Sequence, residues 1–149
     1  MTTAIPERAG LWPRAIAWAY TVALTYGLVA SAPLAILGGP GDAAQEAIDR
    51  SLAGAVQHIV AYAGLAWLWC RVHRGRSRWL WVGALAVAHG LATEVIQLFV
   101  PRRECDWFDM LANVGGVLAG IGLARLLRRR AVRRPPSARE ATAAGAATG

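Results

Sequence analysis

The residues best suited to chemistry lie in the second half of the chain, where polar side chains interrupt long apolar stretches. Glu94 and Gln97 are three residues apart, and Asp109 and Asn113 are four apart. Residues at these spacings share one face of a helix. A carboxylate accepts hydrogen bonds or exchanges a proton, and an amide both donates and accepts. Arg103, between the two pairs, carries a planar guanidinium that suits a carboxylate or a phosphate.

An earlier apolar stretch carries two more polar residues. His58 and Tyr62 are four residues apart, so a helix places them on one face, one turn from each other. An imidazole that lies beside a carboxylate is a suitable acid–base partner. We therefore predict one polar pocket, formed by His58, Tyr62, Glu94, Gln97, Arg103, Asp109 and Asn113.

The composition indicates which kind of secondary structure carries these residues. Of the 149 residues, 56% are hydrophobic and 17% are charged. Apolar blocks occupy residues 15–37, 51–70, 79–100 and 110–124. A helix of about 20 residues crosses a hydrocarbon core of roughly 30 Å, whereas a barrel would need shorter alternating strands. The sequence predicts an all-α integral membrane protein, a bundle of four transmembrane helices.

The charged residues predict how the spans are oriented. All 16 basic residues are arginines, and most precede the first block, separate the second from the third, or follow the fourth. Because positive charge favours the cytoplasmic side, we expect both termini in the cytoplasm and the polar pocket near the opposite face. The predicted divisions are a cytoplasmic lead at 1–14, a membrane domain at 15–127 and a disordered basic tail at 128–149. The arginines suit anionic lipid, and we expect no nucleic-acid partner.

Small residues predict where helices approach each other closely, which is how helices associate in lipid. They recur at every fourth position in the first and last blocks: Ala15, Ala19, Ala23, Gly27, Ser31 and Ala35 in one, and Ala112, Gly116, Gly120 and Ala124 in the other. We interpret both stripes as packing faces, with Gly116 and Gly120 at the centre of the second.

Depth in the membrane favours a functional role for the pocket. At helical rise, His58, Glu94 and Asn113 each lie about 8–10 Å inside the outer end of their block. A charged side chain near the middle of a span costs about 2.5–3.5 kcal/mol on insertion scales. Structural roles remain open, namely an ion pair between Glu94 and Arg103 and a helix cap by Asp109. His89 has no evident partner and is interpreted as a packing residue.

Three functions would use such a pocket. The first, which we favour, is recognition of the phosphate or peptide-like head group of an envelope lipid or lipid-linked precursor. The second is acid–base catalysis on a lipid-linked substrate by Glu94 and His58. The third is proton-coupled transport by a homo-oligomer. We expect no cofactor and no metal, because no metal-ligand spacing is present; a metal held by His58, Glu94 and Asp109 is the minority alternative.

The third and fourth blocks resemble the VanZ-like family of small membrane proteins. The family's pattern there is matched by Glu94, Gln97, Pro101, Arg103, Asp109, Asn113 and Gly116, and an earlier His-x-x-x-Tyr pair by His58 and Tyr62. The chain departs from the family where an Asp-Lys pair often precedes that histidine, since Gly54 and Ala55 stand here. Arg102 also replaces a common glycine.

The resemblance implies a multi-pass protein of the cell membrane that acts at the cell envelope. The founding member of the family is associated with resistance to the glycopeptide antibiotic teicoplanin. An effect on glycopeptide susceptibility is therefore one expectation for this chain. The resemblance does not decide whether the protein is an enzyme, and a binding role is preferred.

Overall fold

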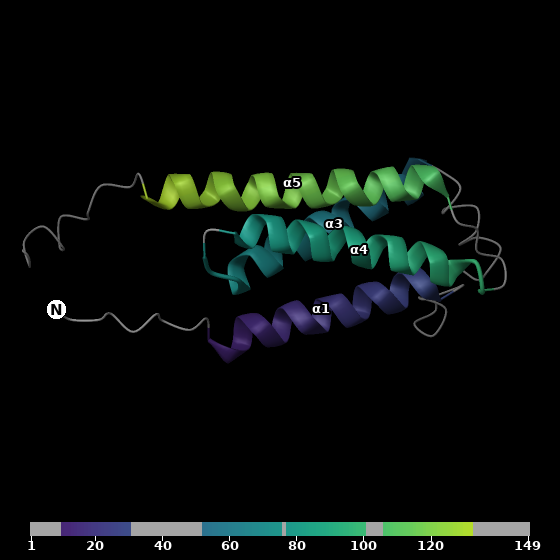
Figure 1. Cartoon of the computed structure of the whole chain (residues 1–149), viewed down its shortest axis with the longest axis horizontal. Coiled ribbons are helices and arrows are strands. Elements are labelled where there is room, and N and C mark those ends of the chain that lie inside the picture. The colour runs from purple at the N-terminus through teal and green to yellow at the C-terminus, as the bar shows by residue number, and fades with distance from the viewer. Residues whose placement is uncertain (1–9, 31–51, 76, 101–105, 133–149) are drawn as a thin grey trace, which may run out of the picture.

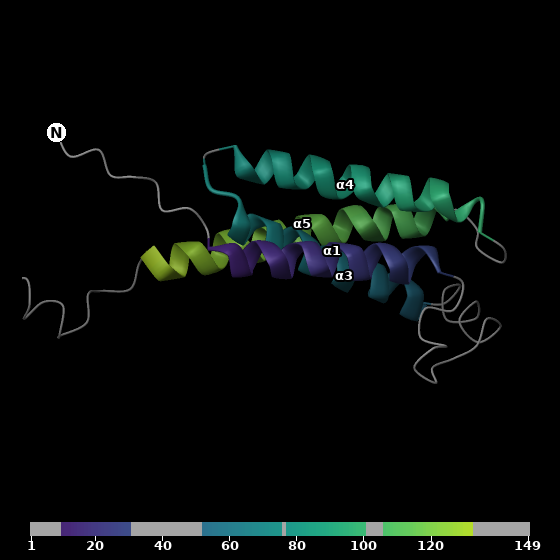
Figure 2. The same ribbon diagram turned by 90° about the horizontal axis from the view of Figure 1, so that it is seen from below.

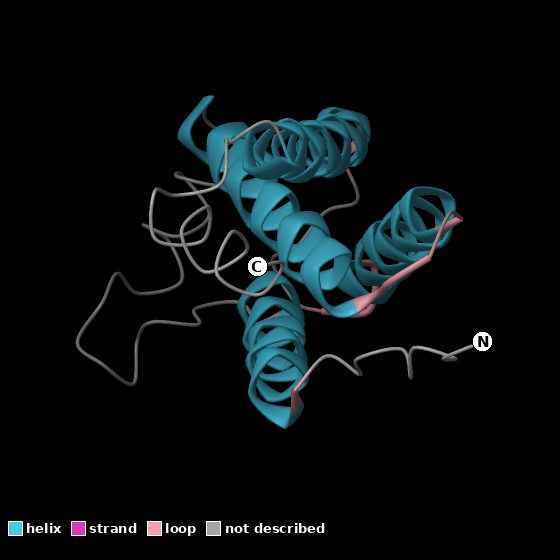
Figure 3. Ribbon diagram, turned by 90° about the vertical axis from the view of Figure 1, so that its left-hand side faces the viewer, coloured by secondary structure: helices cyan, strands magenta, loops and turns pink. Residues whose placement is uncertain are grey.

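The apolar blocks fold into helices. The computed structural model describes residues 10–30, 52–75, 77–100 and 106–132. Within these ranges the helices are α1 (Leu11–Val29), α3 (Leu52–Val72), α4 (Arg78–Gln97) and α5 (Trp107–Val132). The described residues form helices and short loops, with no strand among them (Figure 3). The prediction of an all-α fold is confirmed.

The helix ends differ from those of the blocks. α1 begins at Leu11, inside the predicted lead, and α5 continues to Val132, past the predicted boundary at residue 127. α4 ends at Gln97 because the next amides bond three residues back, Phe99 N to Ile96 O at 3.0 Å and Val100 N to Gln97 O at 3.0 Å. A proline follows at position 101, and the residue before a proline disfavours helical backbone.

Three helices, α3, α4 and α5, are long and apolar enough to cross a membrane. Large apolar side chains also cover the outside of the bundle, among them Ile16, Val22, Leu85, Val95 and Leu118. An apolar surface this extensive is unfavourable in water and fits contact with lipid chains. The chain is therefore built as a membrane protein.

The helices alternate in direction along one long axis (Figures 1 and 2). α1 and α4 finish, and α3 and α5 begin, at the same end of the bundle. The start of α1 and the finish of α5 lie at the other end, together with the arginine-rich link between α3 and α4. α3 and α4 each contact all the other described helices, whereas α1 and α5 lie on opposite sides of them.

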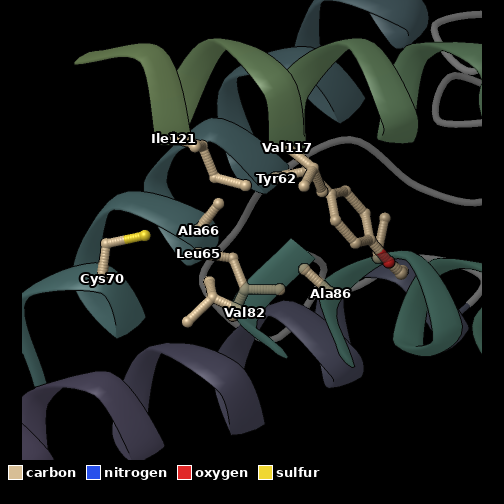
Figure 4. Close-up of a cluster of buried hydrophobic side chains, with 9 residues drawn as sticks. Tyr62, Leu65, Ala66, Cys70, Val82, Ala86, Val117 and Ile121 are labelled. Carbon is tan, nitrogen blue, oxygen red and sulfur yellow. The ribbon is translucent and has the colours of Figure 1, made fainter. Parts of the chain in front are cut away.

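The most extensive contact in the bundle joins α3 to α5. A Cβ atom added at Gly116 would collide with the backbone oxygen of Ile59, and one added at Gly120 would collide with that of Ala63. The two glycines therefore let the backbones of α3 and α5 approach closely. Below this contact, apolar side chains from α3, α4 and α5 fill the centre (Figure 4), including Leu65, Ala66, Val82, Ala86, Val117 and Ile121.

The interpretation of the first stripe as a packing face is wrong for its residues in α1, while Ser31 and Ala35 lie outside the described residues. Ala15, Ala19 and Ala23 are exposed on the bundle surface, and nothing lies within 4 Å of a Cβ atom built at Gly27. The buried residues of α1 are Ala17 and Leu28. Larger side chains decide the packing here, because the Tyr20 hydroxyl donates a 2.9 Å hydrogen bond to Ala61 O on α3.

Candidate functional site

Four of the predicted pocket residues meet where α3, α4 and α5 come together. His58 lies in the second turn of α3, Glu94 in the last turn of α4, and Asp109 and Asn113 in the first two turns of α5. His58 Nδ1 lies 2.8 Å from Asn113 Oδ1, and His58 Nε2 lies 3.6 Å from Asp109 Oδ2. We call these four residues the polar cluster. It combines side chains from three helices at one end of the bundle.

The bond between His58 and Asn113 fixes the role of each imidazole nitrogen. An amide oxygen can only accept a hydrogen bond, so His58 Nδ1 carries the hydrogen and donates it. In the neutral ring, His58 Nε2 then keeps its lone pair. That lone pair lies on the side of Asp109, which places a basic nitrogen and a carboxylate oxygen next to each other.

Glu94 is the most deeply buried member of the polar cluster, with an exposed fraction of 0%. Its Oε2 accepts a long hydrogen bond, 3.4 Å, from the backbone N–H of Asp106. Its Oε1 has no partner among the described residues, and the same holds for Asn113 Nδ2. Buried polar atoms usually have a hydrogen-bond partner. The polar cluster thus has one acceptor, Glu94 Oε1, and one donor, Asn113 Nδ2, that are free to bond a ligand.

The first turn of α5 positions the acidic side of the polar cluster. Asp106 Oδ1 accepts a 2.8 Å hydrogen bond from Phe108 N, and Asp106 O accepts one of 3.1 Å from Met110 N. Asp106 therefore supplies the helix cap that had been considered for Asp109. Asp109 instead lies in the first helical turn, where the positive end of the helix dipole favours an anion.

Tyr62 belongs to a separate polar network. Its hydroxyl lies 3.0 Å from His89 Nδ1 and 3.2 Å from Thr93 Oγ1, both on α4, and Figure 4 shows the ring reaching from α3 toward α4. His89 Nε2 lies 2.9 Å from Thr25 Oγ1 of α1. The interpretation of His89 as a residue without a partner is therefore wrong. The network joins α1, α3 and α4 beside the polar cluster.

Gly90 lets the network and the polar cluster lie side by side. A Cβ atom added there would come within 3.2 Å of Asn113 Nδ2 and 3.4 Å of a Tyr62 ring carbon. Thr93 was not singled out from the sequence, although it lies one turn after His89 on the same face of α4. The available signal was this four-residue spacing, which places Thr93 on the helix face of His89. Thr21 and Thr25 of α1 have the same spacing.

The remaining predicted residues lie elsewhere. Gln97 Nε2 donates a 2.6 Å hydrogen bond to Leu28 O, which ties the end of α4 to the end of α1. Gln97 thus serves a contact between helices and does not bond to the polar cluster in the described structure. Arg103 lies outside the described residues, so its predicted pairing with Glu94 stays a prediction.

The polar cluster also has the composition of a cation site. One ligand atom each from His58, Glu94 and Asp109 can be chosen so that all three lie within 4.8 Å of one another. These residues are far apart in the sequence and come from three helices, so no short sequence motif contains all three. They are the three residues of the metal alternative that the sequence analysis had ranked low.

Comparison with protein-family models gives a match. The model of a family described as VanZ/LLP1 matches residues 12–128, which includes all four described helices except the first residue of α1 and the last residues of α5. The matched range contains every residue of the polar cluster. Comparisons with curated proteins and with solved structures gave no match.

Proposed function

The chain belongs to the VanZ/LLP1 family, and we propose that it recognises the polar head group of an envelope lipid or lipid-linked envelope precursor. In this proposal it is a multi-pass protein of the cell membrane with four transmembrane helices and cytoplasmic termini. The polar cluster binds the head group near the extracytoplasmic face.

The exterior of α1 supports a fourth span. α1 runs alongside α3 and α4 and contacts both. Its outward side carries Ile16, Trp18 and Val22, all exposed, as expected for a helix in contact with lipid chains. With α1 as a span, the start of α1, the finish of α5 and the arginine-rich link fall on one side, which is the cytoplasmic side by the distribution of positive charge.

The observation that carries the ligand proposal is the pair of unsatisfied atoms, Glu94 Oε1 and Asn113 Nδ2. An acceptor and a donor buried on neighbouring helices match a group that itself donates and accepts, such as a hydroxyl or a peptide-like amide. Leaving a buried polar group without a partner costs about 1–3 kcal/mol, so a ligand that satisfies both atoms gains selectivity over one that cannot.

The burial of the polar cluster indicates how the ligand is reached. The Asp109 side chain is 14% exposed and that of His58 is 7% exposed, while Glu94 is fully enclosed. A head group therefore approaches from the side of Asp109, at the start of α5. Trp107 and Phe108 are exposed at the same place, where aromatic side chains suit the membrane interface.

Identification of the lipids that co-purify with the protein tests this function. We expect the parent protein to be enriched in one head-group class relative to the whole membrane. Glu94→Gln keeps the side-chain shape but removes its charge, and it should lose the enrichment. Val95→Ala changes the neighbouring exposed side chain and should retain it. A parent protein whose lipids match the bulk membrane would contradict the proposal. Teicoplanin susceptibility of cells that carry each variant provides the physiological readout.

A further inference from the structure

We propose that His58, Glu94 and Asp109 bind a divalent transition-metal cation, with Zn²⁺ as the best match. The proposal goes beyond head-group recognition, because it is argued only from these three side chains and their surroundings. The three ligand atoms come from α3, α4 and α5 and lie within 4.8 Å of one another. A cation among them would tie the three most closely packed helices together at one end of the bundle.

The distance between two of the three ligand atoms is close to that in a coordination sphere. Two ligand atoms on a tetrahedral cation with bonds of about 2.1 Å lie about 3.4 Å apart. His58 Nε2 and Asp109 Oδ2 lie 3.6 Å apart, which is too long for a good hydrogen bond and close to the tetrahedral value. The ligand atom of Glu94 lies within 4.8 Å of the other two. To complete a tetrahedral site, the Glu94 side chain must move slightly toward them.

Asn113 orients the imidazole as a metal ligand requires. A histidine that binds a metal with one nitrogen usually donates the hydrogen of the other to a carbonyl or carboxylate oxygen. His58 Nδ1 donates to Asn113 Oδ1 at 2.8 Å, which leaves the Nε2 lone pair facing Asp109. A lone pair facing a carboxylate oxygen is repulsive unless a proton or a cation lies between them.

Glu94 supplies an independent observation that points to a ligand. Its side chain is fully buried, and Oε1 has no partner among the described residues. The 3.4 Å bond from Asp106 N to the other oxygen is weak. Burying an ionised carboxylate without compensation is costly. A divalent cation beside Glu94 would compensate its charge.

The ligand set selects the kind of cation. Mg²⁺ and Ca²⁺ prefer sites made entirely of oxygen, whereas an imidazole nitrogen favours transition metals. Among these, Zn²⁺ accepts mixed nitrogen and oxygen ligands in a four-coordinate site. Three protein ligands leave a fourth position open.

The metal content and metal affinity of the full chain test the proposal. The protein is purified with a tag that contains no histidine, stripped with a chelator, and titrated with Zn²⁺ alone. We expect one tightly bound Zn²⁺ per chain. Glu94→Gln and Asp109→Asn should each weaken binding at least about ten-fold, a loss typical of damage to a metal site. His73→Gln, which removes an exposed histidine at the other end of α3, should bind as the parent does.

Thermal unfolding in detergent keeps the test decisive if a variant is poorly stable. Without metal, Glu94→Gln should unfold at the same or a higher temperature than the parent, because it removes an uncompensated charge. Zn²⁺ should raise the unfolding temperature of the parent and of His73→Gln but not that of Glu94→Gln. A parent without a Zn²⁺ effect, or equal binding by parent and Glu94→Gln, would overturn the proposal. A metal-free Glu94→Gln protein less stable than the parent would also overturn it, since Glu94 would then be compensated by another group.

The lipid measurement on the same preparations separates this proposal from the proposed function. A protein that binds no Zn²⁺ yet enriches one head-group class would refute the metal site alone. A protein that binds Zn²⁺ through Glu94 but carries lipids in bulk proportion would refute head-group recognition and leave the metal site in place.

Discussion

His58 of α3 and Asn113 of α5 are 55 positions apart in the chain and are joined by a 2.8 Å hydrogen bond between His58 Nδ1 and Asn113 Oδ1. Both side chains are buried. Because the amide oxygen accepts, the bond fixes which imidazole nitrogen carries the hydrogen and directs Nε2 toward Asp109. One contact between two helices therefore sets the chemistry of the polar cluster.

The bond between His58 and Asn113 should be measurable as a coupling energy. We expect a double-mutant cycle of His58→Ala and Asn113→Ala, followed by unfolding in detergent, to give a coupling of about 0.6–1.7 kcal/mol, the range found for hydrogen bonds between membrane helices. The single variants should each cost more than this, because each also removes packing. Additive losses would contradict the bond.

The glycines of α5 provide a test that needs no knowledge of function. Gly116→Ala and Gly120→Ala should each lower the unfolding temperature, because the added methyl group meets the backbone of α3. Gly115→Ala and Gly122→Ala are matched controls on the same helix, since nothing lies within 4 Å of a Cβ atom at either site. The controls should be neutral or stabilising by up to about 1 kcal/mol, from helix propensity alone. Four equal effects would show that α3 and α5 do not pack in this way.

The orientation in the membrane is testable with cysteines. Cys70 is a free thiol but is buried, with 5% exposure, so it cannot report on the side of the membrane. Ser77 is exposed in the link between α3 and α4, and Ser77→Cys should react with an impermeant maleimide only after the cells are permeabilised. Cys105, which lies outside the described residues, should react in intact cells, with Cys105→Ser as its control. Labelling of Ser77→Cys in intact cells would invert the topology.

The sequence predicts Arg103 as the counterion of Glu94, the cation site is the alternative, and a thermodynamic cycle distinguishes the two. If the two residues pair, Arg103→Ala leaves a buried acid uncompensated and lowers the unfolding temperature, and adding Glu94→Gln restores part of the loss. If the cation site compensates Glu94 instead, the two substitutions should act additively. Unfolding of both single variants and the double variant, each in metal-free buffer and with Zn²⁺, distinguishes the two cases.

The sequence by itself determined the class of the fold. Apolar blocks about 20 residues long leave few choices, because backbone groups in lipid must bond within their own segment, which favours helices. It also determined that His58, Glu94, Asp109 and Asn113 belong to one end of the bundle, because spacing along the chain converts directly into depth along a helix. That Gly116 and Gly120 share one packing face of α5 followed from the same periodicity.

Only the tertiary structure decided which residues at that end touch one another. Depth along a helix says nothing about how the helix is rotated about its axis, and rotation determines a side chain's neighbours. For this reason Tyr62 bonds to His89 and Thr93, and Gln97 bonds to the backbone of α1. Their spacing had assigned both residues to the pocket, because it places Tyr62 on the helix face of His58 and Gln97 on that of Glu94. The prediction that the alanine stripe of α1 is a packing face was wrong for the same reason. Periodicity identifies a helix face, and only the packed bundle shows whether another helix lies against that face.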